Sequence, residues 1–132
     1  AIIDRLLRDC RELADHGIGC VAIMSNDIAA YPEDGPDEMR RWAGELDFPF
    51  PYLYDASQQV ARAYGAVCTP DFFGYNADLR LQYRGRLDAS GRAPAAPEAP
   101  RELFAAMRQI AASGRGPSEQ NASIGCSIKW QN

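Results

Sequence analysis

The sequence is poor in the residues that most catalytic and metal sites require. Its 132 residues include one histidine, His16, and its four cysteines form neither a Cys-x-x-Cys pair nor a zinc-ligand spacing. A Ser-His-Asp triad or a histidine metal site therefore has little support. We expect no metal site.

Strong basic segments and long apolar runs are also missing. Lys and Arg together number 14 and Asp and Glu 18, which gives a net charge of −4 with both signs scattered along the chain. Nucleic acid is not an expected partner, because no basic stripe is present to neutralise phosphates. No run is long enough for a membrane span, and no signal-peptide pattern opens the chain. We expect no membrane partner and a cytoplasmic location.

The composition that is present predicts a single domain. With 46% hydrophobic and 24% charged residues, 132 residues can bury one core. We expect residues 1–132 to form this domain, with residues 118–132 as a C-terminal tail packed on its body around Trp130. The chain begins at Ala1, without Met and without a helix-capping residue, inside a helical pattern. This start suggests a fragment that has lost upstream residues.

Apolar spacing and turn residues predict an alternation of helices and strands. The pattern indicates a first helix ending at Gly17, a strand at 18–24 buried on both faces, and a helix at 37–46. A short strand at 52–54 precedes a helix that Asp55 or Ser57 can cap. The remaining elements are a hairpin of 71–75 and 79–86, a loop at 89–100 and a helix at 101–113.

Two sets of side chains are expected to face the core. On the helix after Asp55 the buried side is Val60, Ala61 and Tyr64, and on the second hairpin strand the covered face holds Leu79, Leu81 and Tyr83. Helix followed by a fully buried strand is typical of α/β proteins.

The turn at Thr69-Pro70 is the most informative local feature. Proline has no N–H and biases the preceding residue toward extended backbone, so this junction should open a strand. An X-Pro bond can be cis or trans, and the dipeptide alone fits an ordinary trans proline on an edge strand.

A family resemblance relates this turn to a known fold. Residues 54–73, ending in Cys-Thr-Pro-Asp-Phe-Phe, and residues 78–85 resemble the alkyl hydroperoxide reductase and thiol-specific antioxidant (redoxin) branch of the thioredoxin-like superfamily. The resemblance extends to residues 18–27 and 125–130, and is nearest to bacterial proteins called thioredoxin family protein. It implies an α/β thioredoxin-like fold with a central mixed sheet flanked by helices, the first strand being absent from this chain. It also implies a cis proline at Pro70.

The same resemblance assigns provisional roles to four residues. It implies a strand and a Cys-x-x-Cys turn directly upstream of Ala1, so the principal redox cysteines would lie outside this chain. Thr69 and Pro70 would bind substrate, and Cys68 and Cys126 are secondary catalytic candidates. Cys68 is expected to face the redox pocket, while Cys126 is either a resolving thiol or a simple tail thiol.

The other two cysteines are expected to be inert. Cys10 lies on the apolar stripe of the first helix and Cys20 in the buried strand, so both should be core thiols. Arg84 or Arg86, after the proline turn, could lower a thiol pKa or could simply lie on an exposed face.

The function implied by the resemblance is thiol-disulfide exchange or peroxide reduction, as in an antioxidant, peroxiredoxin-like protein. The substrate would be a thiol, a disulfide or a peroxide. Electrons would come from a partner thiol protein, and the resemblance implies no dissociable cofactor. The chain alone is expected to be inactive, and its oligomeric state cannot be read from the sequence. Two alternatives remain: a non-catalytic thioredoxin-like binding module, and a flavodoxin-like nucleotide binder, for which residues 25–28 lack the necessary glycines.

Overall fold

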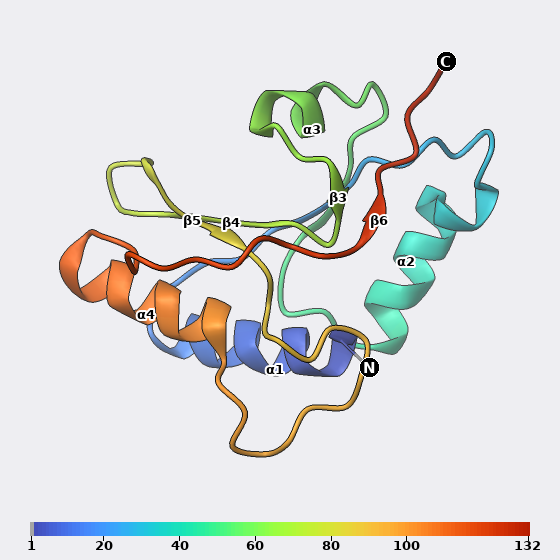
Figure 1. Cartoon of the computed structure of the whole chain (residues 1–132). Coiled ribbons are helices and arrows are strands. Elements are labelled where there is room, and N and C mark those ends of the chain that lie inside the picture. Colours follow the sequence, from blue (N-terminus) through green and yellow to red (C-terminus); the bar gives the residue numbers. More distant parts are fainter. Residues whose placement is uncertain (1) are drawn as a thin grey trace. The chain divides into compact units, whose positions relative to one another are not determined.

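The computed structural model describes residues 2–132, which form two compact units (Figure 1). The first unit contains residues 2–19 and 68–126, and the second contains residues 20–67 and 127–132. Within the described residues no helix is both long and apolar enough to cross a membrane.

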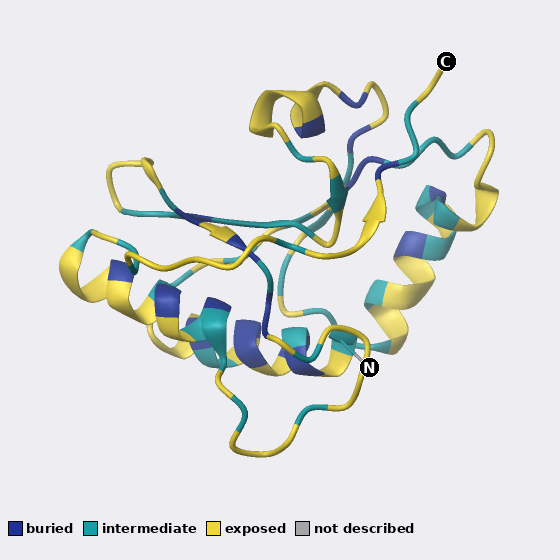
Figure 2. Cartoon of the chain, in the orientation of Figure 1, coloured by how far each residue is buried: buried dark blue, intermediate teal, exposed yellow. Residues whose placement is uncertain are grey.

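Two helices pack against a hairpin in the first unit. Helices α1 (Ile2–Asp15) and α4 (Glu102–Ser113) contact each other, and α4 also contacts strands β4 (Phe72–Tyr75) and β5 (Leu81–Gly85). Glycines in left-handed backbone end both helices, Gly17 with φ 75° and Gly114 with φ 76°, as the sequence indicated. The core is a cluster of buried side chains: Tyr83, Leu87, Leu103, Ala106 and Ile110 (Figure 2).

The predicted apolar stripe of α1 is confirmed. Leu7, Cys10 and Leu13 are buried, so Cys10 is the core thiol that the sequence indicated. Asp9 on the same helix is also buried, and it accepts hydrogen bonds from Arg101 Nε at 2.9 Å and Nη2 at 2.7 Å. This ion pair ties α1 to the residue that precedes α4.

The antiparallel hairpin has the expected strands but a different covered face. Tyr83 is buried, whereas Leu79 is 82% and Leu81 47% exposed, so the prediction for the two leucines was wrong. The register shifts between Gly74 and Tyr75, and Leu79 lies in the turn with φ 60° rather than in β5. The covered face expected for 79–86 therefore begins only at Tyr83, inside β5.

The C-terminal tail follows β5 in the first unit. Arg86 N–H donates to Asn121 O at 3.1 Å, and Arg84 N–H donates to Gln120 Oε1 at 2.9 Å. A Cβ on Gly116 would lie 1.9 Å from Gln82 O, so only glycine allows this approach. Residues 116–123 thus occupy the side of β5 away from β4.

The second unit contains a small parallel sheet. Strands β1 (Ala22–Met24) and β2 (Tyr52–Tyr54) pair with Ile23 opposite Leu53, and the chain between them forms a 3₁₀ turn, η1 (Pro32–Asp34), and helix α2 (Pro36–Glu45). The expectation of a strand buried on both faces was wrong: β1 has three residues, and Ile23 is 41% exposed. Cys20 is accordingly half-buried rather than a core thiol.

Helix α3 (Gln59–Tyr64) begins at a buried polar cluster. Asp55, as expected, contacts its first turn, accepting from Ala61 N at 2.9 Å and Val60 N at 3.3 Å. Burial alone would raise the pKa of Asp55, but these N–H groups and the Ser25 hydroxyl hold it below its ordinary value. Only Ala61 is buried on α3, so the predicted burial of Val60 and Tyr64 was wrong.

The end of the tail is fixed within the second unit by Gln58. Its side-chain amide donates to Ser25 O at 2.7 Å and Lys129 O at 2.8 Å, and its Oε1 accepts from Gln131 N at 2.9 Å. Ile128 is buried, whereas Trp130 is half-buried under the Arg62 guanidinium, 4.2 Å from its ring centroid. The tail therefore packs through Ile128 more than through Trp130.

Candidate functional site

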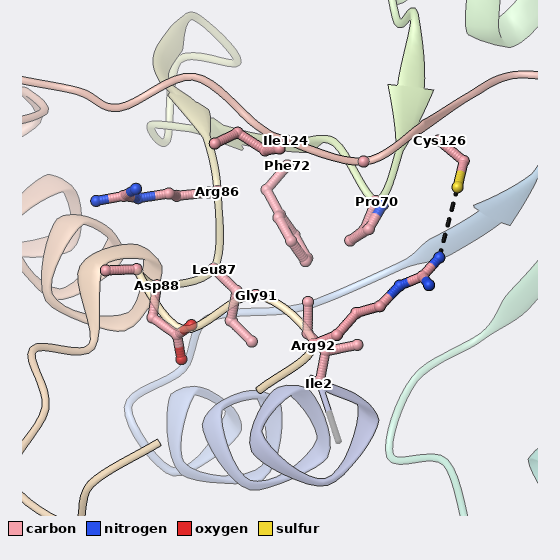
Figure 3. A pocket seen from close by; sticks show the side chains of 12 residues that line it. Ile2, Pro70, Phe72, Arg86, Leu87, Asp88, Gly91, Arg92, Ile124 and Cys126 are labelled. Carbon is pink, nitrogen blue, oxygen red and sulfur yellow. Dashed lines mark hydrogen bonds between the residues drawn. The ribbon is translucent and has the colours of Figure 1, made fainter. Parts of the chain in front are cut away.

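The first unit contains a pocket of about 440 Å³ (Figure 3). It lies between the start of α1, the segment after β5, the proline turn and the tail. Its lining residues are Ile2, Pro70, Phe72, Arg86, Leu87, Asp88, Ala89, Gly91, Arg92, Ile124, Gly125 and Cys126. Two of the four residues expected at a redox site, Pro70 and Cys126, therefore meet at one cavity.

An ion pair anchors the wall formed by residues 86–92. Arg5 of α1 and Asp88 are both buried, and Arg5 Nε donates to Asp88 Oδ2 at 2.8 Å. Arg5 also donates to Gly91 O and, at 3.0 Å, to Ala93 O, while Ser90 N donates to Asp88 Oδ1 at 3.0 Å. The guanidinium thus holds several turns of an otherwise irregular loop, which carries Arg92.

Arg92 reaches the thiol of Cys126 across the pocket opening. Its Nη2 lies 3.5 Å from Cys126 Sγ, the contact drawn as a dashed line in Figure 3. Both side chains are exposed, and the thiol is therefore open to a small molecule in solvent. The sequence showed the 89–100 segment only as a loop, and no local signal connected Arg92 with a cysteine 34 positions away.

The proline turn places its backbone against the tail. The Thr69–Pro70 peptide bond is cis, and the Thr69 hydroxyl donates to Cys126 O at 3.4 Å. A Cβ on Gly125 would lie 2.1 Å from Thr69 O, so the tail comes within backbone contact of the turn. Pro70 lines the pocket, and Thr69, outside the lining, holds the segment that carries Cys126.

Cys68 precedes the same turn but is not among the residues that line the pocket. Burial raises the pKa of its half-buried thiol above the ordinary value, the Asp71 carboxylate raises it further, and the Arg84 guanidinium partly opposes both effects. A raised pKa leaves less thiolate near neutral pH, which makes Cys68 the weaker nucleophile candidate.

We expect the alkylation of Cys68 by iodoacetamide to keep accelerating above pH 9.0, the ordinary thiol value, because the folded pKa lies higher. Replacing Asp71 with asparagine removes the negative charge and should speed Cys68 alkylation several-fold at pH 8. Mass spectrometry of each cysteine peptide measures these rates. The Asp78→Asn variant in the hairpin turn is the control, and a wild-type rate that levels off below pH 9 would contradict this environment.

The other charged groups of the pocket are already paired. Arg86 donates to both carboxylate oxygens of Glu102 at 3.0 Å, and this pairing lowers the pKa of Glu102. Of the two arginines considered from the sequence, Arg86 lines the pocket in an ion pair, and Arg84 only partly offsets the raised pKa of Cys68. Among residues 2–132 no group of three or more His, Cys, Asp or Glu side chains is placed to hold a metal ion.

Comparison with known proteins identifies a family and structurally similar proteins. A family model described as AhpC/TSA family matches residues 2–89. An uncharacterized conserved protein from Geobacillus kaustophilus is 46% identical, with a TM-score of 0.87 over 96% of this chain and 67% of that one. A hypothetical protein from Sinorhizobium meliloti is 38% identical, with a TM-score of 0.84 over 96% of this chain and 69% of that one. No curated protein matches.

These similarities confirm the resemblance to redoxin proteins and the mixed α/β, thioredoxin-like fold class.

Proposed function

We propose that this chain, which belongs to the AhpC/TSA family, carries the substrate pocket of a thiol-disulfide oxidoreductase or thiol-dependent peroxidase. Membership of the family supports thiol-based redox chemistry in general. The observation that carries the proposal for this chain is the pocket itself, where Pro70 and the exposed thiol of Cys126 lie on one cavity.

The proposed roles follow from the positions around this pocket. Pro70 forms part of the surface on which the substrate rests, and Thr69 holds the Cys126 segment through its hydroxyl. The attacking cysteine belongs to a segment preceding α1, whose first turn lines the pocket through Ile2. A helix N-terminus favours a thiolate, because its free N–H groups and its dipole stabilise negative charge. Cys126 is the second, resolving thiol, and Cys68 is the weaker candidate for that role.

With a peroxide, the attacking thiolate takes the terminal oxygen and becomes a sulfenic acid, while the rest of the peroxide leaves as an alcohol or water after protonation. The Cys126 thiol then attacks the sulfenic sulfur, which releases water and forms a disulfide. A partner dithiol protein reduces this disulfide and is itself oxidised. With a disulfide substrate, the first step is thiol exchange, and Cys126 resolves the mixed disulfide.

We expect the 132-residue chain to show negligible reduction of hydrogen peroxide or insulin disulfides, because the attacking thiol is not among its four cysteines. The longer product of the same gene should be active and should carry an upstream Cys-x-x-Cys pair. Coupled peroxidase and insulin-turbidity assays on both proteins measure this difference. The longer product with Cys126→Ser should lose turnover, whereas Cys10→Ser, at the buried thiol, is the matched control.

Comparable turnover by both proteins would show that the reactive cysteine lies within residues 1–132. An upstream segment without a Cys-x-x-Cys pair would remove the enzyme hypothesis as stated, and unchanged turnover in Cys126→Ser would assign resolution to the second cysteine of that pair. The rival function is a non-catalytic thioredoxin-like binding module. That rival predicts that no turnover appears in either protein.

A further inference from the structure

We propose that the pocket takes small disulfides that combine an apolar body with an anionic group, the anion binding Arg92 while one sulfur faces Cys126. This inference rests on the proposed function and names the substrate class of the same site. Three features carry it: the walls of the pocket, its unbalanced charge and the position of the thiol.

The walls are mostly apolar. Leu87 is buried and Ile2 and Phe72 are half-buried, and all three, with Pro70 and Ile124, line the cavity. A volume of about 440 Å³ suits a small molecule, since ligand pockets usually enclose roughly 300–1,000 Å³. Such walls favour a hydrocarbon or aromatic body over a strongly hydrated one.

The charge of the pocket is uneven. Asp88 is paired with Arg5 at 2.8 Å and Arg86 with Glu102 at 3.0 Å, so each of these lining charges has its counter-ion. Among the described residues, Arg92 has no carboxylate within ion-pair distance, and its side chain contacts Cys126 Sγ. A guanidinium in this position matches a carboxylate, which it can bind through two parallel N–H groups.

The thiol lies beside the proposed anion site, because Arg92 Nη2 is 3.5 Å from Cys126 Sγ. A ligand whose carboxylate pairs with Arg92 therefore brings its own sulfur near Sγ. On the 132-residue chain, where the proposed attacking cysteine is not present, Cys126 itself makes the exchange: its thiolate bonds to one ligand sulfur and the ligand S–S bond breaks. The other half leaves as a thiolate, so one disulfide replaces another and no further oxidant is needed.

Cys68 provides a comparison within the same molecule. Its thiol lies near the Asp71 carboxylate, which raises its pKa, and it does not line the pocket. The Arg84 guanidinium near Cys68 is paired with the same Asp71 carboxylate at 3.1 Å, so the preference for negative charge should be stronger at Cys126 than at Cys68.

Two aromatic disulfides test the proposal on the 132-residue chain. Dithiobis(nitrobenzoate) carries a carboxylate on each ring, whereas dithiodipyridine is neutral. Rates at each cysteine are measured by mass spectrometry in low-salt buffer at neutral pH. We expect the anionic-to-neutral rate ratio at Cys126 to fall about fivefold in Arg92→Gln, the size of one exposed ion pair, and to fall similarly in wild type at high salt.

The Arg80→Gln variant is the matched control, because it removes the same charge from an exposed position in the hairpin turn. Its ratio at Cys126 should remain that of the wild type. Equal ratios in Arg92→Gln and wild type would overturn the anionic substrate class while leaving the proposed function in place. A Cys126 thiol that reacts with neither reagent would overturn both, since the pocket would then hold no accessible thiol.

Discussion

Replacing Asp88 with alanine is expected to lower the free energy of unfolding by about 3–5 kcal/mol, because the buried Arg5 guanidinium would lose its carboxylate. The loss should be large because Arg5 also holds the Gly91 and Ala93 carbonyls, so it cannot turn to solvent without releasing the loop. Urea unfolding followed by circular dichroism measures the change. This is the largest stability effect expected from a single residue of the pocket wall.

The Asp37→Ala variant is the matched control for Asp88→Ala. Asp37 pairs with Arg40 on the exposed side of α2, and exposed pairs contribute about 0–1 kcal/mol. The double variant Arg5→Met with Asp88→Leu should recover most of the loss, because it leaves no buried charge without a partner. A cost below about 1 kcal/mol for Asp88→Ala would show that the loop opens and hydrates Arg5 readily.

Replacing Gly125 with alanine is expected to move Cys126 away from Arg92. The new Cβ would meet the backbone oxygen of Thr69 at 2.1 Å, and a backbone atom cannot turn aside as a flexible side chain can. The tail must therefore shift, at a cost of about 1–3 kcal/mol in unfolding free energy. The charge preference of Cys126 for anionic disulfides should disappear in the same variant.

Gly44→Ala provides the comparison for this effect. A Cβ at Gly44, within α2, meets no atom within 4 Å, and alanine favours a helix over glycine by about 1 kcal/mol. This variant should be as stable as the wild type or more stable, with an unchanged Cys126. Wild-type reactivity of Cys126 in Gly125→Ala would show that the tail reaches the pocket without the close approach to Thr69.

Local sequence signals predicted the elements that depend on local interactions. The apolar stripe of α1 and the glycines after α1 and α4 predicted where these helices lie and end. Apolar spacing and left-handed glycine caps are signals that act within a few residues. The same kind of signal was wrong for Ile23 and Leu81, whose exposure depends on which neighbours cover a strand face.

The candidate site was predictable only in part. Pro70 and Cys126 could be named because they resemble a family pattern, and they line one pocket. Arg92 could not be named, because its position depends on the Arg5–Asp88 pair, which joins residues 83 positions apart. No spacing rule connects such residues, since the pairing is made by tertiary packing of the loop on α1.

The course of the tail along β5 also covers one edge of the hairpin. Residues 116–123 occupy the backbone groups of Arg84 and Arg86 that would otherwise offer free N–H donors to another chain. A proteolytic cut near Gly116 would uncover this strand, and uncovered strands recruit further strands into aggregates. Residues 116–123, which lead to the Cys126 segment, therefore also cover an edge of β5 that would otherwise be open to pairing with another chain.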